Sequence, residues 1–321
     1  MRMETSMDRT VKEIHEKRST LYNESIRNHK KYINESTGLF SSEFVEYRNC
    51  PVCAEDKYLK IFNKEGGTYV KCKECNMIYL NPVFTEKSLN DYYVNNHDLQ
   101  SSIVENDQEF YLSLYNKGLK SIENNNSERN KILDIGCSSG VFLDQAKTNN
   151  WTTFGVELNT TEAEYAKKKS HTVYCELLEN ISFDSKFDAI TLWDVFEHLV
   201  DGEFYLNTLK NLLNRKGVIF LQIPSSDSLA AKIMKEKCNM FCGLEHVNLY
   251  GVETITQLVN KCGFEVLDMQ TVISEIGVIN NFLNYEDPYL GGTKNKVNIP
   301  NIIDEDQIHK TLQGYKMQLV L

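Results

Sequence analysis

The stretch Lys131–Phe142 (KILDIGCSSGVF) constrains the fold of this chain more than any other. An apolar strand runs into Asp134, Gly136 and Gly140 bracket a tight turn, and the apolar pattern of a helix follows. This order is typical of a nucleotide-binding βα unit, because glycine lets the backbone approach a ligand and the N–H groups at a helix start favour polar or anionic groups. Ser138 replaces the middle glycine of the usual fingerprint, so a purely structural turn stays open as an alternative.

Strands and helices alternate from Lys131 onward, which predicts a parallel sheet of the α/β class. We expect further strands at 151–156, 172–174, 187–193 and 217–223, and another that begins at 264. Between the second and third strands, Thr161 and Glu164 match a capping box and predict the start of a helix.

Glu157 follows the second expected strand. A carboxylate at this position can accept two ribose hydroxyl groups, as in dinucleotide-binding folds. Together with Asp134, Gly136 and Gly140, Glu157 indicates an adenosine-type ligand whose ribose carries no phosphate, because a 2′-phosphate prefers arginine. These residues alone do not separate a nicotinamide-dependent enzyme from a methyltransferase.

Four cysteines, Cys50, Cys53, Cys72 and Cys75, form two C-x2-C pairs separated by eighteen residues. This is a zinc-ribbon spacing, in which each pair aims two sulfurs at one ion and four thiolates complete a closed tetrahedral site. Since no coordination position stays open, we expect the zinc to be structural rather than catalytic. Residues 46–83 hold six Lys/Arg against five Asp/Glu, which argues against a ribbon that binds nucleic acid.

The charge of the chain limits its partners. The formal net charge is −10, whereas a general binder of nucleic acid or anionic membranes needs a basic face. The first residues are charged and show no apolar core of a signal peptide, and no stretch has the length of a membrane span. Nine cysteines, an odd and unevenly placed set, fit a reducing compartment. We therefore expect a cytoplasmic protein without a membrane or nucleic-acid partner.

Two further stretches carry a resemblance to a known family: FDAITLWDVFEHLVD at 187–201 and GVIFLQIPS at 217–225. With the turn at 131–142, they make residues 130 to 270 resemble the class I S-adenosylmethionine (SAM)-dependent methyltransferases. The resemblance is to the small-molecule group in which Asp-x-x-Glu-His follows the fourth strand. It implies SAM as the cofactor and a Rossmann-like sheet of seven mainly parallel strands with one antiparallel edge strand.

The resemblance also implies where the cofactor would lie. The turn after the first strand would face its methionine part, and Glu157 would take the ribose hydroxyls. Glu176 and the Leu177 backbone would lie beside the adenine, and Trp193 and Asp194 near the sulfonium. The implied cofactor-binding residues are Asp134, Gly136, Cys137, Gly140, Glu157, Leu158, Glu176, Leu177, Trp193 and Asp194.

An N-terminal ribbon before such a domain is similar to the zinc-binding sugar C- and O-methyltransferases and their relatives in surface-polysaccharide or secondary-metabolite pathways. In the C-methyltransferases a Glu-His pair after the fifth strand and a tyrosine before the Rossmann-like domain serve the reaction. By position, this resemblance implies Glu245 and His246 as catalytic residues and Tyr92 or Tyr93 as substrate-binding residues. The implied acceptor is a small polar molecule, such as a nucleotide-linked sugar.

Methyl transfer is an in-line displacement, so the acceptor must be held in place with its proton removable. Histidine has a suitable unperturbed pKa for the base. His198 follows the fourth strand and His246 the fifth, so both are candidates, and the alternative for each is a histidine held by packing hydrogen bonds. His29 is expected at the surface.

The expected domain order is a helical or disordered arm at 1–45, a zinc ribbon at 46–83, connecting helices at 84–128, a Rossmann-like SAM-binding domain at 129–275 and a C-terminal lid or tail at 276–321. Two alternative functions stay open: a zinc-ribbon scaffold whose methyltransferase fold is not catalytic, and methylation of RNA or protein. A nicotinamide-dependent dehydrogenase is disfavoured by the stretch Asp194–His198.

Overall fold

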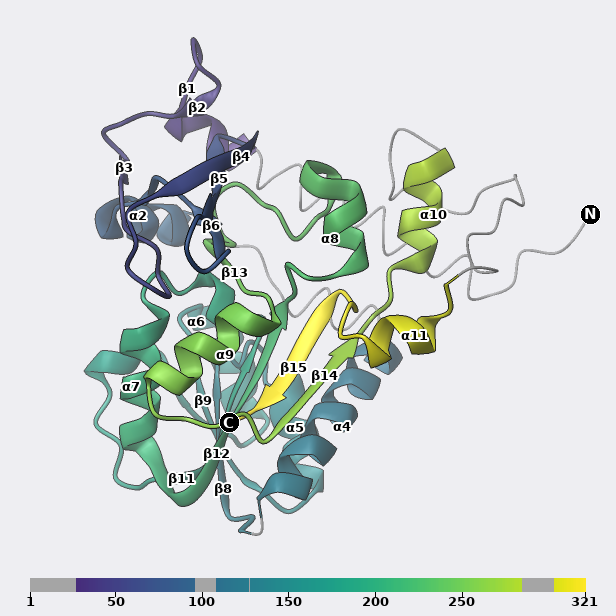
Figure 1. Ribbon diagram of the computed structural model, residues 1–321. Coiled ribbons are helices and arrows are strands. Elements are labelled where there is room, and N and C mark those ends of the chain that lie inside the picture. Colours follow the sequence, from purple (N-terminus) through teal and green to yellow (C-terminus); the bar gives the residue numbers. More distant parts are fainter. Residues whose placement is uncertain (1–26, 96–107, 127, 285–302) are drawn as a thin grey trace, which may run out of the picture. The chain divides into compact units, whose positions relative to one another are not determined.

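The computed structural model describes residues 27–95, 108–126, 128–284 and 303–321 (Figure 1). The chain forms two compact units, each built from segments that are far apart in the sequence. Of the described residues, the first unit comprises 27–95, 225–251, 271–284 and 303–316. The second unit comprises the described residues 108–126, 128–224, 252–270 and 317–321.

The second unit is built around a seven-stranded sheet with the strand order β10-β9-β8-β11-β12-β15-β14 (Figure 1). Its strands are β8 (Lys131–Ile135), β9 (Thr152–Val156), β10 (Thr172–Tyr174), β11 (Phe187–Trp193), β12 (Leu213–Pro224), β14 (Asp268–Val272) and β15 (Lys316–Val320). The central strand β11 is buried along its whole length, as expected of a strand covered on both faces. The predicted α/β class and Rossmann-like seven-stranded sheet are confirmed.

One strand of this sheet runs against the others, and it is not the edge strand. Strands β10, β9, β8, β11 and β12 pair in parallel. Ile219 on β12 and Leu321, directly after β15, exchange both of their N–H···O=C bonds, which is an antiparallel pairing. Because β15 lies between β12 and β14, the expectation of an antiparallel edge strand is wrong. After Lys316, the residues of β15 are buried on both faces, which suits an inner position.

The described helices of the second unit are α4 (Gln108–Asn125), α5 (Val141–Thr148), α6 (Thr160–Lys168), α7 (Gly202–Leu212) and α9 (Val252–Lys261), with short turns at η2 (Leu178–Asn180) and η3 (Phe196–His198). Helix α6 is capped by Asn159, whose Oδ1 accepts from the N–H groups of Thr161 and Glu162. The predicted capping box from Thr161 to Glu164 is therefore wrong. Asn159, which is extended and directly precedes the helix, caps it by accepting from these first backbone N–H groups.

Helix α4 packs closely on the sheet at Gly118. A Cβ atom at this position would overlap Trp193 and would lie 2.6 Å from a ring carbon of Phe220. One turn further on, the Ser121 hydroxyl donates to the Asp268 carboxylate at the start of β14. The segment predicted to connect two domains thus contributes a helix to the second unit.

The first unit is built around a four-stranded antiparallel sheet with the order β13-β6-β5-β4. Its strands are β4 (Tyr58–Lys64), β5 (Gly67–Cys72), β6 (Ile78–Leu80) and β13 (Asn248–Leu249). The other described elements are η1 (Lys30–Tyr32), β1 (Ile33–Asn34), β2 (Leu39–Phe40), β3 (Val45–Glu46), β7 (Val83–Phe84), α2 (Glu86–Asn95), α8 (Leu229–Met234), η4 (Lys235–Lys237), α10 (Ile276–Asn284) and α11 (Glu305–Lys310).

Strand β13 joins the cysteine-bearing sheet from a distant part of the sequence, and Arg48 fixes it there. The Arg48 guanidinium donates from Nη2 to the Val247 carbonyl (2.8 Å) and to Asn248 Oδ1 (2.9 Å). It also donates from Nε to the Leu80 carbonyl (3.2 Å) and lies over the Tyr79 ring at 5.3 Å. The rigid fork of arginine therefore bridges β6 and β13.

The domain borders differ from the predicted ones. Strand β15 belongs to the sheet of the second unit, although it comes from the predicted lid or tail at 276–321. Ser225–Gly251, inside the predicted SAM-binding domain, belongs to the first unit, because β13 pairs with β6. Residues 1–26 of the predicted arm lie outside the described residues.

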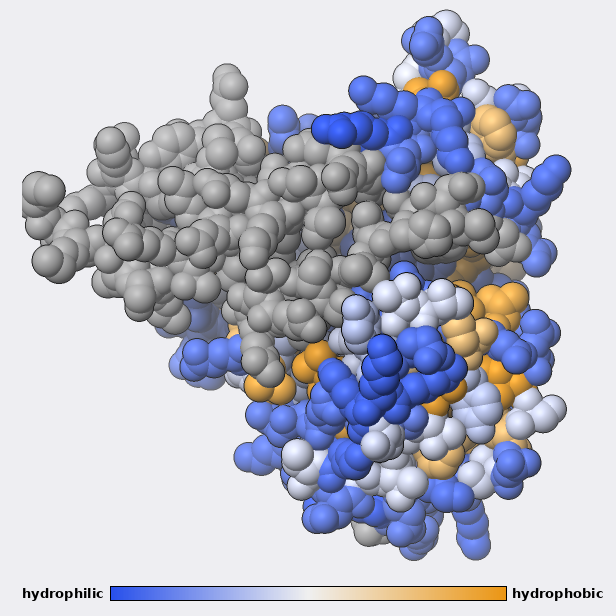
Figure 2. Space-filling view, turned by 180° about the vertical axis from the view of Figure 1, so that it is seen from behind, coloured by the Kyte–Doolittle hydropathy of each residue, from blue (hydrophilic) through white to orange (hydrophobic). Residues whose placement is uncertain are grey.

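The described residues on the face shown in Figure 2 are mostly hydrophilic, with hydrophobic residues scattered among them. Exposed apolar side chains of the described residues include Leu59 and Ile61 on β4 and Leu158 and Leu177 in the second unit. No helix within 27–95, 108–126, 128–284 and 303–321 has both the length and the apolar character needed to cross a membrane.

Candidate cofactor and metal sites

The turn between β8 and α5 is shaped by three residues with left-handed backbone conformation. Gly136, Ser138 and Gly140 have φ of 73°, 48° and 79°. Glycine adopts this region without strain, whereas an L-residue such as serine does so at a cost of about 1–2 kcal/mol. Ser138 thus keeps the conformation expected of the glycine that it replaces, and its hydroxyl donates to the buried carboxylate of Glu162.

The carboxylate of Glu157 is oriented by backbone donors on both sides. Oε2 accepts from the Ser138 N–H and Oε1 accepts from the Asn159 N–H, each at 2.8 Å. Burial raises the pKa of Glu157, these N–H groups lower it, and the nearby Glu162 raises it further. The βα turn and the end of β9 therefore meet at one fixed acidic group.

Asp134, at the end of β8, is a nearly fully buried acid. Its side chain is 2% exposed and accepts a hydrogen bond from Thr191 Oγ1 on β11 at 2.6 Å. Burial raises the pKa of Asp134 to about 8; the Thr191 hydrogen bond opposes this shift and the charge of Glu157 adds to it. A positive group next to Asp134 would offset both effects.

Aromatic rings pack beside these acids. The Trp193 ring lies 4.9 Å from Tyr115, 5.0 Å from Phe142 and 4.5 Å from Phe220, measured between ring centroids. The pKa of Tyr115 is raised, first by burial and then by the charges of Asp134 and Asp194, so this phenol lies near both carboxylates. No local signal in the sequence marks Tyr115, which lies on α4, as a site residue.

The residues expected beside the adenine follow two neighbouring strands. Strands β9 and β10 pair in parallel, and the Glu157 N–H donates to the Tyr174 carbonyl at their ends. Leu158 and Leu177 are 55% and 39% exposed, and Glu176 is also exposed. Two apolar side chains are thus open to solvent at adjacent strand ends.

Cys137 is placed differently from the other expected cofactor residues. Its side chain is 3% exposed, and a Cβ atom at Gly155 would lie 2.5 Å from its sulfur. Its N–H donates to the Val156 carbonyl. The Cys137 thiol therefore fills a gap against β9.

The four cysteines of the first unit lie together. Cys50 Sγ is 3.5 Å from Cys75 Sγ, and Cys53 Sγ is 3.5 Å from Cys72 Sγ. All four sulfurs lie within 4.8 Å of one another. Tetrahedral coordination with zinc–sulfur bonds of about 2.3 Å requires sulfurs about 3.8 Å apart, so the group has the size of a four-cysteine metal site.

A second polar cluster of the first unit joins Tyr92, Glu245 and His29. The Tyr92 hydroxyl donates to Glu245 Oε1 at 2.7 Å and lies 3.3 Å from His29 Nε2. His29 is 2% exposed, and burial lowers its pKa, so the expectation of a surface histidine is wrong. The physical reason is the aromatic cluster around Tyr92, into which η1 brings this residue.

His246 and His198 belong to different units. His246 Nδ1 lies 2.7 Å from the Met240 carbonyl, which can only accept, so the neutral ring carries its proton on Nδ1 and its lone pair on Nε2. His198 ends the short turn η3 after β11. The side chain of Tyr93 lies outside the described residues.

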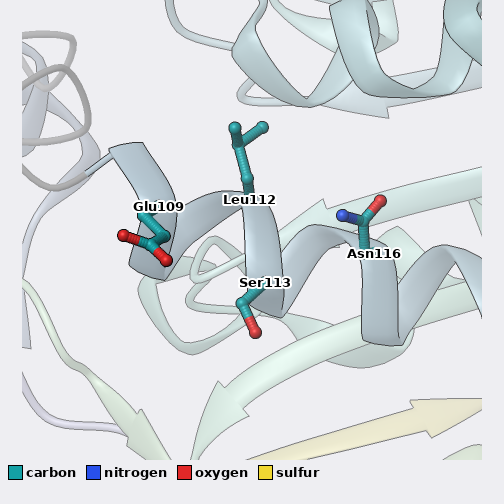
Figure 3. Close-up of a pocket in the computed structure, with 4 residues that line it drawn as sticks. All are labelled: Glu109, Leu112, Ser113 and Asn116. Carbon is teal, nitrogen blue, oxygen red and sulfur yellow. The ribbon is translucent and has the colours of Figure 1, made fainter.

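Figure 3 shows Glu109, Leu112, Ser113 and Asn116, which line an open hollow of about 580 Å³ on one face of α4. Asn116 Oδ1 accepts from Gln145 Nε2 at 2.6 Å. None of the expected site residues whose side chains are described lines this hollow.

Comparison with known proteins gives distant relatives. The chain is 28% identical over 107 residues to the ubiquinone biosynthesis O-methyltransferase of Pasteurella multocida, an alignment that covers 28% of this chain and 44% of the relative. It is 30% identical over 100 residues to the enzyme of the same name from Bartonella tribocorum, covering 28% and 40%. The chain thus spans less than half the length of these curated relatives.

Solved structures with similar folds are also distant. One is the plantazolicin methyltransferase in complex with a pentazolic desmethylPZN analog and SAH, at 17% identity and a TM-score of 0.47, covering 72% of this chain and 90% of that one. Another is a SAM-dependent methyltransferase from Thermotoga maritima, described as a possible histamine N-methyltransferase, at 18% identity and a TM-score of 0.43, covering 68% and 94%.

A family model gives the broadest match within this chain. The model is described as "Methyltransferase domain" and matches residues 105–269. This region holds strands β8 to β12, the βα turn and the acids Asp134 and Glu157. Because the match covers slightly more than half of the sequence, the chain belongs to the methyltransferase domain family.

Proposed function

We propose that this chain is a SAM-dependent methyltransferase that acts on a small polar acceptor. The observation that carries the proposal is the group of acids and aromatic rings at the ends of β8, β9 and β11: Asp134, Glu157 and Asp194 with Trp193 and Tyr115. The carboxyl ends of parallel strands are where open α/β sheets bind ligands. Carboxylates and aromatic faces attract cations, and SAM carries an ammonium and a sulfonium group.

The described side chains fit SAM. A cation next to Asp134 would favour the ionised form that burial and Glu157 now oppose. Glu157 offers a carboxylate whose orientation is fixed by two backbone N–H groups, which suits the two ribose hydroxyls. Adenine would cover Leu158 and Leu177, the two exposed leucines at adjacent strand ends, beside Glu176.

Bound SAM supplies an electrophilic methyl group, so the protein has to hold the acceptor and take its proton. We propose that His246 and Glu245 serve the acceptor together with Tyr92. His246 is suited to proton removal by its tautomer. Its Nδ1–H donates to the Met240 carbonyl, so Nε2 carries the lone pair that can accept a proton. The bond from Tyr92 to Glu245 orients both groups. His198 is a second candidate for the base, and Tyr93 stays a prediction.

A hydroxyl group of a nucleotide-linked sugar, or of a polysaccharide or secondary-metabolite precursor, is the acceptor that we propose. The matched relatives are named O-methyltransferases, which supports oxygen as the methylated atom. The formal net charge of −10 disfavours a polyanionic acceptor such as RNA.

We also propose that Cys50, Cys53, Cys72 and Cys75 bind one structural Zn²⁺. Burial raises the pKa of the Cys50 thiol to about 11, so without a cation this thiol stays protonated at neutral pH. A bound metal reverses this by stabilising the thiolates. The backbone N–H of Glu74 lies 3.4 Å from Cys72 Sγ and would donate to that thiolate.

Calorimetric titration of the zinc-loaded protein with SAM, S-adenosylhomocysteine and NAD tests the cofactor. We expect micromolar binding of the first two ligands and none of NAD. Glu157→Ala removes the acceptor of two ribose hydroxyls and should weaken SAM binding at least about 100-fold. Glu164→Ala is the matched control, because this exposed acid of α6 pairs with Lys167 on the same helix.

Binding of NAD without SAM would replace the methyltransferase by a dehydrogenase. Equal binding by Glu157→Ala and Glu164→Ala would remove Glu157 from the cofactor site. With SAM binding established, turnover against nucleotide-linked sugars with free hydroxyl groups tests the acceptor, and Glu245→Gln and His246→Gln should each lower kcat.

A further inference from the structure

Three glutamine side chains form a hydrogen-bonded row across adjacent strands of the second unit. Gln270 on β14 donates from Nε2 to Gln318 Oε1 on β15 at 3.1 Å. Gln318 Nε2 donates to Gln222 Oε1 on β12 at 2.8 Å. Gln222 Nε2 then donates to Asp194 Oδ2 at 3.0 Å. We call Gln222, Gln318 and Gln270 the glutamine ladder.

All three amides of the glutamine ladder point their donors in the same direction, toward Asp194. In such a row each hydrogen bond polarises the next, and a low local dielectric strengthens all of them. Gln222 and Gln318 are 2% and 1% exposed, so water does not compete for their amide groups. The ladder therefore presents the positive end of a row of dipoles to one oxygen of the Asp194 carboxyl group.

Gln222 also holds the main chain of Asp194. The Asp194 N–H donates to the Gln222 carbonyl at 2.9 Å, and the preceding Trp193 pairs in register with Gln222. The backbone of Asp194 has φ of 55°, in the left-handed region that few residues other than glycine adopt. Such conformations persist where the surroundings fix them, and they gather at ligand sites.

The burial of side-chain amides in the core of a sheet requires a physical explanation. Leucine or methionine would fill the same space without polar groups that must be paired, and a broken link would leave a buried donor or acceptor unsatisfied. The sequence nevertheless places an amide on each of three strands that lie side by side in the sheet in the order β12-β15-β14, which differs from their order in the chain. The row ends on a carboxyl group beside the aromatic cluster of Tyr115 and Trp193.

We propose that Gln222, Gln318 and Gln270 are positioning residues of the cofactor site, which hold the Asp194 carboxylate in one orientation toward the cation of the cofactor. This proposal rests on the proposed function, in which Asp194 lines the SAM site. Gln318 and Gln270 act through Gln222 and Asp194.

The test is a double-mutant cycle on the Kd for SAM, measured by calorimetry on the full zinc-loaded chain. The variants are Gln318→Met, Asp194→Asn and the two combined. Methionine matches glutamine in length but cannot donate to Gln222. The matched control is Ser121→Ala, which removes a hydrogen bond from another buried side chain of the same unit, to Asp268 on β14.

We expect Gln318→Met to raise the Kd about five- to tenfold, the usual effect of losing one buried hydrogen bond. Ser121→Ala should leave the Kd within about twofold of the wild type. In the Asp194→Asn background, Gln318→Met should have no further effect, because the ladder acts only through that carboxylate. If Gln318→Met does not fold, Gln270→Met at the less buried end of the ladder replaces it in the cycle.

An unchanged Kd for folded Gln318→Met would overturn the role of the ladder, and so would an equal loss with and without the Asp194 carboxylate. If the wild type binds SAM in either of these cases, the proposed function stands and only the ladder fails. A wild type that does not bind SAM would overturn both.

Discussion

The surroundings of the Asp134 carboxyl group disfavour its ionised form. It is buried at the end of β8, and the acid of Glu157 lies nearby. The Thr191 hydrogen bond only partly offsets these effects, so the pKa is raised to about 8. In the absence of a cation, the folded protein therefore holds a proton at neutral pH that the unfolded chain releases.

The stability of the ligand-free protein should depend on this proton. The stabilising contribution is fully present below the unfolded pKa of 3.8 and is lost as the pH rises through the folded value of about 8. Urea unfolding at pH 6, 7 and 8 should show the free energy of unfolding falling by up to about 1.4 kcal/mol per pH unit, the effect of one proton. Asp134→Asn should remove this contribution from the slope, and Asp184→Asn, at an exposed site, should leave it in place.

Saturating SAM should flatten the same slope in the wild type, because its cation would favour the ionised carboxylate. Identical slopes in the wild type and Asp134→Asn would contradict the assignment of a raised pKa to this residue.

At the scale of elements, helix α4 has little room to move against the sheet of the second unit. Its contact with the sheet runs through Gly118, which leaves no space for a side chain against Trp193 and Phe220. Three residues earlier, the same helix places Tyr115 beside Trp193. The position of α4 thus determines the aromatic side of the proposed SAM site.

Gly118→Ala should therefore destabilise the protein, although alanine is the better helix former. The gain in helix propensity is about 1 kcal/mol, and overpacking against two rings costs typically about 1–3 kcal/mol. We expect a net loss of up to about 2 kcal/mol in urea unfolding, together with weaker SAM binding. The matched control is Gly277→Ala on α10, where a Cβ atom would have no neighbour within 4 Å, and this variant should be more stable than the wild type. A stabilising effect at both positions would mean that α4 shifts without cost.

At the scale of the whole molecule, each unit has its own source of stability. The second unit has a large apolar core that includes Ile132, Leu143 and Ala189. The first unit has a smaller cluster around Tyr32, Phe84 and Tyr92, and short strands near the four cysteines. Small folds of this kind draw much of their folding free energy from a bound metal.

Chelation should therefore affect the two units differently. Removing the metal should release hydrogen-exchange protection in β4, β5, β6 and β13, while β8, β11 and β12 keep theirs. Hydrogen-exchange mass spectrometry before and after chelation measures this, with elemental analysis of the untreated protein to show the expected one zinc per chain. Cys72→Ser should reproduce the effect, and Cys262→Ser, at a cysteine outside the cluster, should not. Protection that is unchanged in β5 and β6 after complete metal loss would show that the ribbon needs no metal.

The amino-acid sequence by itself determined the features that lie in one continuous stretch. The spacing of the cysteine pairs, the turn at 131–142 and the alternation of strands and helices all depend on neighbours in the chain, so period and turn chemistry predict them. Only the tertiary structure decided which distant segments meet. Strand β13 pairs with β6, β15 lies between β12 and β14, His29 contacts Tyr92, and three glutamines form the glutamine ladder. These contacts follow from the burial of side chains and the pairing of backbone groups across the fold. A local sequence pattern does not predict which distant residue becomes the partner in such a contact.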